Sequence, residues 1–320
     1  MGSERTITRI WRDAIAREHP GPAYVTQHED HWHEVTWQEA GERVAALANG
    51  LLARGIGKGD AFAIFARTTL EWALFDFALA HVGAVVTPVY ATSSAKDLEY
   101  LLGHSESVGV LCEGPEQRDM VEGCRAGLPQ LRHVLTFDDL DALEARGHAY
   151  AVEDPSALDE AVATIDEEDL YTFIYTSGTT GPPKGCMIRH RNYYEMVAVV
   201  DALPRYADDG DVMLLYLPLA HNFGRLLHLA GPYVGFTTAF LADPLAVADA
   251  LPTIRPTVLP SVPRVYEKIH TAVLAAFEDT TGPKRRIVDW ALQVGRQASA
   301  LREEERPVPA ALSLRRTCTP

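Results

Sequence analysis

A loop rich in hydroxyl, glycine and lysine residues carries the strongest chemical signal in the sequence. Residues 175–185 read Tyr-Thr-Ser-Gly-Thr-Thr-Gly-Pro-Pro-Lys-Gly and follow directly on a predicted strand at 170–175. Glycines let a backbone approach a ligand closely, hydroxyls donate hydrogen bonds, and Lys184 supplies a positive charge. The order differs from the Walker pattern, because Lys184 follows Pro183 and precedes Gly185. The residues therefore predict a polyphosphate site of another kind, since a plain polar surface loop would not explain this order.

This loop resembles the signature loop of the adenylate-forming superfamily, which includes acyl-CoA synthetases, luciferases and peptide-synthetase adenylation domains. The resemblance implies that the loop wraps the β- and γ-phosphates of ATP. The residues that it assigns to these phosphates are Thr176, Ser177, Gly178, Thr179, Thr180 and Gly181. Thr176 would also help to hold Mg²⁺, together with a Glu that this sequence lacks, and Lys184 would lie near the phosphates.

A second segment narrows the resemblance to one branch of that superfamily. Residues 217–225 read Leu-Pro-Leu-Ala-His-Asn-Phe-Gly-Arg and resemble the acyl and adenylate pocket of long-chain fatty acyl-CoA synthetases. This implies that His221 lies beside the acyl carboxylate or at the gate of an acyl tunnel, with Arg225 in the same pocket. Taken alone, a histidine at a strand end is more often a structural residue. Residues 90–94 and 259–268 also resemble the long-chain members, with an architectural role expected for both.

The resemblance implies a ligase reaction with ATP, Mg²⁺ and coenzyme A. In this family a fatty acid carboxylate attacks the α-phosphate of ATP and expels pyrophosphate, and coenzyme A then displaces AMP from the acyl-adenylate. The family's remaining parts are an aromatic-Gly-x-Thr-Glu motif, an Asp that holds the ribose and a C-terminal domain with a lysine. None of them follows Lys268 in this sequence, so no catalytic set is complete.

The extent of the resemblance leads to an expectation about activity. It runs from about residue 8 to about 305, and residues 306–320 do not resemble the family. We expect the N-terminal part of a long-chain fatty acid CoA ligase that does not complete the reaction alone. A truncation, a frameshift or a separately encoded second half would each give such a sequence. The alternatives are a nucleotide-binding remnant without catalysis, half of a split enzyme that pairs with a separate C-terminal polypeptide, or a ligase for a different carboxylic acid.

The elements that must position these residues alternate between helical and strand patterns, which is typical of an α/β protein with mostly parallel sheets. The resemblance implies an incomplete N-terminal domain of the adenylate-forming fold, with αβ subdomains at 8–165 and 166–305, a tail at 306–320 and no C-terminal small domain. Helices are predicted at 36–52, 70–82, 94–104 and 263–277, and strands at 61–66, 84–89, 108–112, 170–175, 212–217 and 257–259. The acidic, Ala-rich stretch 138–168 is interpreted as a surface connection, and Asn192 as a helix N-cap.

Composition excludes several classes of protein. The 320 residues carry 29 Lys and Arg against 44 Asp and Glu, a net charge of −15, which argues against binding to nucleic acid. The four cysteines have no regular spacing and are expected to be reduced thiols. The N-terminal residues lack the apolar core of a signal peptide, and no segment is apolar enough to span a membrane. We therefore expect a cytoplasmic protein, with weak peripheral contact with a membrane as an alternative.

Three other clusters could be mistaken for sites. His28, His31 and His33 lie in an alternating pattern that favours an exposed hairpin over a metal site. The glycines at 55–59 precede a predicted strand, which indicates a turn between a helix and a strand. The basic run 284–286 is interpreted as a solvated helix face, with membrane-surface contact as the alternative.

Overall fold

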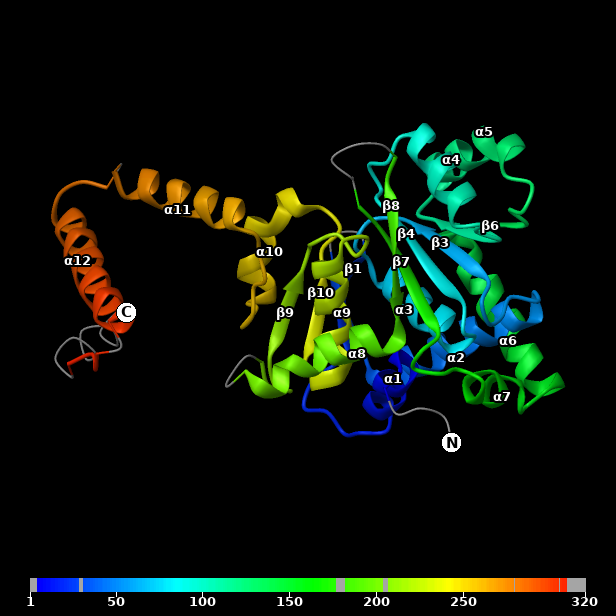
Figure 1. Cartoon of the computed structure of the whole chain (residues 1–320). Helices are drawn as coiled ribbons and strands as arrows, with labels where there is room; N and C mark the ends of the chain where they lie inside the picture. The colour runs from blue at the N-terminus through cyan, green and yellow to red at the C-terminus, as the bar shows by residue number, and fades with distance from the viewer. Residues whose placement is uncertain are drawn as a thin grey trace. The chain divides into compact units, whose positions relative to one another are not determined.

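The computed structural model describes residues 5–28, 31–176, 182–203, 207–278, 280–304 and 306–309. These residues divide into two compact units, residues 1–260 and 261–320. The first unit holds two β-sheets and the helices that cover them, and the second holds two long helices (Figure 1). The candidate site residues all lie in the first unit.

The larger sheet of the first unit has six strands. Their spatial order is β6 (His133–Thr136), β5 (Gly109–Cys112), β3 (Ala61–Phe65), β4 (Val85–Val89), β7 (Leu170–Thr176) and β8 (Lys184–Arg189). All neighbours in this sheet are parallel except β7 and β8, which form an antiparallel pair at one edge. The strands β3, β4 and β5 are buried along their whole length, as expected of parallel strands covered on both faces.

The smaller sheet has four strands, in the order β2 (His31–Val35), β1 (Tyr24–His28), β10 (Thr237–Phe240) and β9 (Val212–Leu215). Only β1 and β2 pair antiparallel, with His28 opposite His31, which confirms the predicted hairpin. Each sheet therefore draws strands from both sides of residue 165. The division into subdomains at 8–165 and 166–305 stays a prediction.

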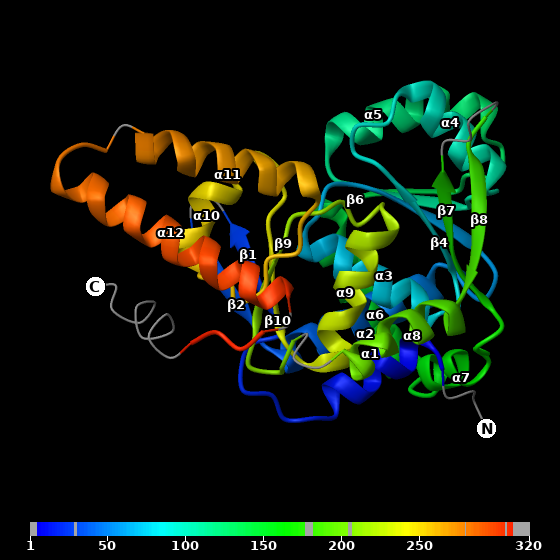
Figure 2. The same ribbon diagram turned by 60° about the vertical axis from the view of Figure 1, so that its left-hand side comes forward.

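Helices pack around and between the two sheets (Figures 1 and 2). In the first unit they are α1 (Ile7–Ile15), α2 (Trp37–Ala53), α3 (Leu70–His81), α4 (Ala95–His104), α5 (Pro115–Cys124), α6 (Leu140–Glu153), α7 (Ala157–Ala163), α8 (His190–Ala198), α9 (Asn222–Val234) and α10 (Val247–Ile254), with short 3₁₀ helices at Arg125–Gly127, Phe137–Asp139, Val199–Ala202 and Pro244–Ala246. Helix α3 is apolar on all sides and buried at every residue except Glu71, as expected of a helix in the middle of a large core. A separate apolar cluster lies under α4 and α5.

Local signals in the sequence explain most helix boundaries. Helix α2 begins after Thr36, whose hydroxyl accepts from the Glu39 N–H while the Glu39 carboxylate accepts from the Thr36 N–H, the capping box that the sequence predicts. The predicted helices at 70–82, 94–104 and 263–277 and the predicted strands at 61–66, 84–89, 108–112 and 170–175 are also confirmed. The predicted strand 257–259 is reduced to a single bridge between Met213 and Val258. The glycines at 55–59 do connect α2 to β3.

The interpretation of residues 138–168 as a surface connection was wrong. This stretch forms α6 and α7, and α6 packs tightly against α2. Leu140, Leu143 and Gly147 are the buried residues of α6. A methyl group on Gly147 would lie 1.8 Å from the Ala46 carbonyl oxygen, so the glycine lets the two helices approach closely. Because small residues form this crossing, the stretch contains few large apolar side chains, and its sequence does not show the pattern of a packed helix.

Two further sequence interpretations need correction near residue 190. Residues 184–189 form strand β8, although Lys184 and Gly185 belong to the predicted loop. Helix α8 begins after Arg189, and Asn192 is its third residue; the Asn192 side chain accepts from the Arg189 N–H at 2.9 Å. The Asn192 side chain therefore does cap the helix start, but from inside the helix.

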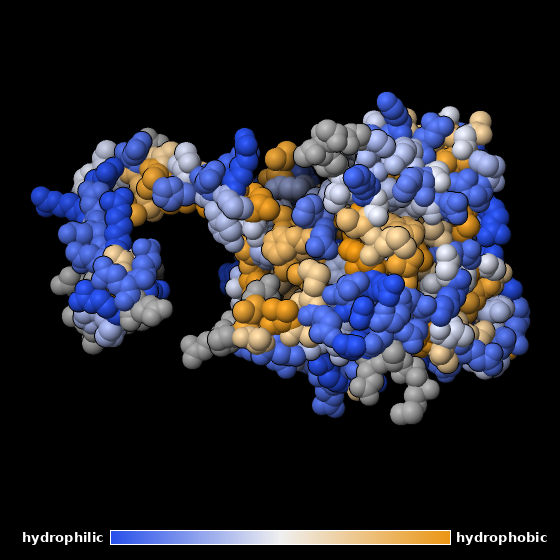
Figure 3. Space-filling view, viewed as in Figure 1, coloured by the Kyte–Doolittle hydropathy of each residue, from blue (hydrophilic) through white to orange (hydrophobic). Residues whose placement is uncertain are grey.

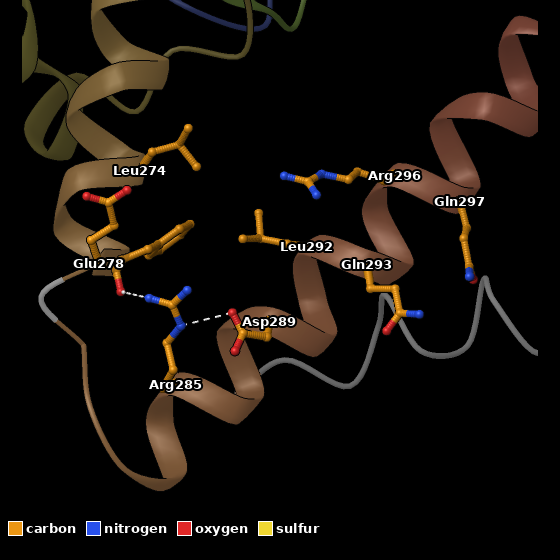
Figure 4. Close-up of a pocket in the computed structure, with 9 residues that line it drawn as sticks. Leu274, Glu278, Arg285, Asp289, Leu292, Gln293, Arg296 and Gln297 are labelled. Carbon is orange, nitrogen blue, oxygen red and sulfur yellow. Dashed lines mark hydrogen bonds and ion pairs between the residues drawn. The ribbon is translucent and has the colours of Figure 1, made fainter.

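The second unit consists of α11 (Pro263–Glu278) and α12 (Pro283–Glu303). A groove between the two helices contains Arg285, which donates to the Phe277 carbonyl oxygen at 3.2 Å and to Asp289 at 2.9 Å (Figure 4). Lys284 and Arg286 are exposed on α12, which confirms that the basic run lies on a solvated helix face. In the ranges that the structure describes, no helix is both long and apolar enough to cross a membrane.

Candidate functional site

The hairpin of β7 and β8 holds the two ends of the predicted phosphate loop. Thr176 is the last residue of β7, Lys184 is the first of β8, and they are direct partners across the antiparallel pair. Partners in such a pair place their side chains on the same face of the sheet. Both side chains are exposed. The predicted phosphate ligands Ser177, Gly178, Thr179, Thr180 and Gly181 lie outside the described residues, so the structure brings together only Thr176 and Lys184 of this set.

Helix α4 contacts the loop end of this hairpin. The Tyr100 hydroxyl donates to the Pro183 carbonyl oxygen at 2.9 Å, and His104 Nδ1 is 2.9 Å from the Tyr175 hydroxyl. The rings of Tyr100 and His104 are stacked with their centroids 5.3 Å apart. Burial raises the pKa of Tyr175 to about 12, so its hydroxyl stays protonated at neutral pH and can donate to His104. These contacts fix both strands of the hairpin next to the loop.

Close packing explains one glycine of the hairpin. A methyl group on Gly185 would lie 3.2 Å from the Tyr175 ring, tighter than ordinary contact. Gly185 therefore allows the Tyr175 ring to cover the neighbouring strand. Gly185, the last glycine of the motif, therefore has a packing role in the hairpin. The sequence alone did not indicate this role.

His221 is the N-cap of α9. Its Nδ1 accepts from the Phe223 N–H at 3.2 Å, and the residue is exposed. The turn before the helix is tight, because a methyl group on Gly224 would lie 2.3 Å from the Pro218 carbonyl oxygen. Two residues of the motif at 217–225 therefore have structural roles: Gly224 permits the tight turn, and His221 caps the helix. A capping bond through Nδ1 leaves Nε2 of His221 for another partner, and its place beside an acyl carboxylate stays a prediction.

Arg225 lies one turn into α9 and is fully buried. Its guanidinium forms an ion pair with Asp76 of α3 and donates to the Thr172 hydroxyl of β7 at 2.7 Å. Burial opposes the charge of Arg225, but the Asp76 carboxylate outweighs that effect and keeps the pKa of the arginine above its usual range. With these contacts the guanidinium faces the interior, and the predicted role of Arg225 in the acyl/adenylate pocket stays a prediction.

The predicted Mg²⁺ site is not formed by the described residues alone. They contain no group of three or more His, Cys, Asp or Glu side chains that could hold a metal ion. Thr176 supplies one hydroxyl at the end of β7, and a hard cation such as Mg²⁺ needs several oxygen ligands. The histidines of the β1–β2 hairpin lie along a strand pair and do not converge with acidic residues into such a group.

Sequence reasoning missed the residues that support the loop from a distance. Tyr100 and His104 lie on a helix more than 70 residues before the loop, and Asp76 lies on α3. A signal was present for Asp76 and Arg225, because each is the charged residue that interrupts a nearly continuous apolar helix pattern. Two buried charges of opposite sign usually pair with each other.

Comparison with known proteins places the chain in one family. The sequence profile of the AMP-binding enzyme family matches residues 12–307. A long-chain-fatty-acid–CoA ligase of Mycobacterium tuberculosis, FadD15, is 38% identical over 242 residues, which are 75% of this chain and 40% of that protein. Fatty acyl-CoA synthetase A of Dictyostelium discoideum is 30% identical over 84% of this chain and 41% of its own. The chain thus spans about 40% of the length of these curated relatives.

Solved structures agree on the fold. An inhibitor-bound crystal structure of the N-terminal domain of FACL13 from Mycobacterium tuberculosis matches with a TM-score of 0.70 at 23% identity, over 82% of this chain and 64% of that one. An ATP-bound chimera of RpMatB and BxBclM matches with a TM-score of 0.67 at 26% identity, over 82% of this chain and 50% of its own. These matches confirm the predicted α/β fold of an adenylate-forming N-terminal domain. With a family profile covering residues 12–307, the chain belongs to the AMP-binding enzyme family.

Proposed function

We propose that this chain is the N-terminal part of a long-chain fatty acid CoA ligase and that it supplies the ATP phosphate site. The observation that carries the proposal is the hairpin of β7 and β8, which pairs Thr176 with Lys184 around a loop of the family's signature sequence. The similarity to FadD15 supports the substrate class, because that relative is named as a long-chain fatty acid CoA ligase.

In the proposed first step, a fatty acid carboxylate oxygen bonds to the α-phosphorus of ATP, and the bond to pyrophosphate breaks. Residues 176–181 would surround the β- and γ-phosphates, and Lys184 would offset the negative charge that the leaving pyrophosphate carries. Catalysis at this stage is chiefly positioning and charge stabilisation. In the second step the thiol of coenzyme A would bond to the acyl carbonyl carbon, and AMP would leave. The similarity to an ATP-bound chimera of the same fold supports ATP as the nucleotide.

The remaining site residues belong to the same proposal. His221 would face the acyl carboxylate, with Arg225 behind it in α9. Mg²⁺ would neutralise phosphate charge when bound, with the Thr176 hydroxyl as one ligand and the Glu that the family resemblance implies as another. We propose a cytoplasmic location, with peripheral contact with a membrane as a weaker alternative.

A reaction assay tests the proposal for the chain alone. The 320-residue chain, incubated with ATP, Mg²⁺, palmitate and coenzyme A, is expected to form neither AMP nor palmitoyl-CoA at an enzymatic rate. FadD15 under the same conditions is the positive control. Turnover comparable with that of FadD15 would show that the chain is a complete ligase, which contradicts the proposal.

A second function, pairing with a separate C-terminal polypeptide, is favoured by exposed apolar side chains on the first unit. Met196 of α8, Val199 of the following 3₁₀ helix and Leu203 directly after it are 40%, 53% and 46% exposed, and Figure 3 shows apolar surface on this side. Such patches mark interaction surfaces. The test mixes this chain with a polypeptide made of the C-terminal part of FadD15, which lies beyond the matched residues, and measures the molar mass by light scattering. A mass equal to the sum of the two would support pairing, and the two separate masses would contradict it. If FadD15 accepts palmitate but the pair prefers a shorter acid, a ligase for a different carboxylic acid is supported instead.

A further inference from the structure

A buried polar network joins the two parts of the candidate site. Asp76 of α3 is at its centre, and its carboxylate accepts from Arg225 of α9 and from the Tyr171 hydroxyl of β7, the latter at 2.6 Å. Arg225 also donates to the Thr172 hydroxyl, which donates in turn to the Val86 carbonyl oxygen of β4 at 2.7 Å. Asp76, Tyr171, Thr172 and Arg225 have no exposed surface.

The network is enclosed by aromatic rings. The Arg225 guanidinium lies 4.5 Å from the Tyr171 ring centroid, 5.3 Å from that of Trp72 and 5.9 Å from that of Tyr193. The Tyr193 hydroxyl of α8 donates to the Asn222 side chain at 2.6 Å, so α8 holds the first residue of α9. A charge in such a site is stable only with its partner, because water cannot replace the lost contact.

Each end of the network lies close to a candidate site residue. Thr172 is on the strand that ends at Thr176, and Arg225 is in the first turn of the helix that His221 caps. The Arg225 N–H donates to the His221 carbonyl oxygen at 3.0 Å. A change in the network can therefore reach the end of β7 at Thr176 and the start of α9 through regular secondary structure.

We propose that Arg225 is a positioning residue that, through Asp76, fixes strand β7 and helix α9 relative to each other and so aligns the two parts of the site. This inference rests on the proposed function only for its effect on ATP. Its structural part, that β7 and α9 are held as one body by this pair, stands on the contacts alone.

The test separates alignment from stability with three variants of the full chain. Arg225→Met leaves the Asp76 charge buried without its partner, and it is expected to lower the thermal midpoint and weaken ATP binding about fivefold or more in calorimetry. Asp76→Asn/Arg225→Met removes both charges, so its thermal midpoint should recover while ATP binding stays weak. Leu143→Ala, in the packing of α6 on α2, is the control that destabilises the core away from the network.

Each outcome decides the proposal. An ATP Kd for the double variant equal to that of the wild type overturns it, as does an equal weakening in Leu143→Ala. If Arg225→Met does not fold, the double variant and the wild type make the same comparison. If the wild-type chain binds no ATP, the proposed function fails, and amide hydrogen exchange decides the inference alone. Exchange in residues 171–176 and 222–229 should then rise together in the double variant but not in Leu143→Ala, and unchanged exchange would overturn it.

Discussion

Single side chains from distant parts of the sequence contact the two strands that flank the phosphate loop. Tyr100 and His104 contact the hairpin through the Pro183 carbonyl and the Tyr175 hydroxyl, and both come from one face of α4. Neither residue belongs to the loop motif. Because these contacts join both strands of the hairpin to α4, we expect them to reduce the conformational entropy that is lost on ligand binding.

Replacing Tyr100 with phenylalanine tests this support. Tyr100→Phe removes the hydrogen bond to Pro183 and keeps the ring, so we expect ATP to bind roughly fivefold more weakly, which corresponds to a hydrogen bond of about 1 kcal/mol. The measurement is calorimetric titration with ATP. Tyr150→Phe on α6 is the matched control, and a loss of affinity as large in this variant would contradict the role of Tyr100.

The residues of the site differ in how far the sequence could predict them. Thr176 and Lys184 could be found because they lie in one contiguous motif, and the structure pairs them. The ion pair between Asp76 and Arg225 joins residues 149 positions apart, and local pattern does not fix which distant charges meet. Tyr100 offered no signal at all, since an aromatic residue at helical spacing is the ordinary composition of a packed helix face.

At the scale of elements, the pair α2 and α6 shows how small residues determine packing. Gly50 on α2 and Gly147 on α6 lie where the helices cross, and a methyl group on Gly50 would lie 2.4 Å from the Leu143 carbonyl oxygen. The backbones therefore approach more closely than any larger side chain would permit. Helix α2 could be predicted from its capping residues Thr36 and Glu39. Helix α6 could not, because it packs through a glycine against the backbone of α2, and such a contact leaves no pattern of large apolar residues in the sequence.

Gly147→Ala is expected to destabilise this helix pair. The added methyl group would overlap the Ala46 carbonyl, and overpacking of this kind typically costs about 1–3 kcal/mol. Urea unfolding gives the change in the free energy of unfolding. Gly123→Ala on α5 is the control, because nothing lies within 4 Å of its added methyl group, and it should leave stability unchanged or slightly higher. Equal effects of the two substitutions would show that close approach does not matter.

The contact between α1 and α8 gives the protein a pH-dependent element. His190, the first residue of α8, is fully buried, and its Nδ1 accepts from the Ile7 N–H at the start of α1 at 3.2 Å. Burial lowers the pKa of His190 to about 4, and burial likewise lowers the pKa of His81 on α3 to about 4. Both side chains are therefore neutral in the folded protein near pH 7.

The sign of the pH effect follows from these shifts. In the unfolded chain each imidazole takes up a proton near pH 6.5, before the folded protein does, so the free energy of unfolding falls as the pH drops from about 6.5 towards 4. The slope is at most about 1.4 kcal/mol per pH unit for each histidine. His190→Asn should lower stability at pH 7.5 but flatten the dependence between pH 6.5 and 5, measured by urea unfolding. His148→Asn, at an exposed position, should keep the wild-type slope, and an unchanged slope in His190→Asn would contradict this account.

At the scale of the whole molecule, the order of strands along the sequence differs from their order in space. The hairpin of β1 and β2 joins the sheet of β9 and β10, about 180 residues later, while β7 and β8 complete the sheet of β3 to β6. Alternation of helices and strands correctly predicted an α/β fold, but it could not show this exchange, because pairing between distant strands depends on the complete tertiary structure. Strand β8 was not predicted, since most of its residues are exposed, only Gly185 and Ile188 are partly buried, and the sequence lacks an alternating pattern.

In the proposed function, the hairpin of β7 and β8 presents a nucleotide phosphate site, so the affinity of the chain for ATP reports on this hairpin directly. Calorimetric titration of the full chain with ATP and Mg²⁺, compared with the Lys184→Ala variant, isolates the charge at the end of the loop. We predict measurable binding by the wild type and a loss of about tenfold or more in Lys184→Ala, since a charged hydrogen bond to phosphate is worth roughly 1.5–3 kcal/mol. Equal affinities of the two proteins, or no binding by the wild type, would contradict the claim.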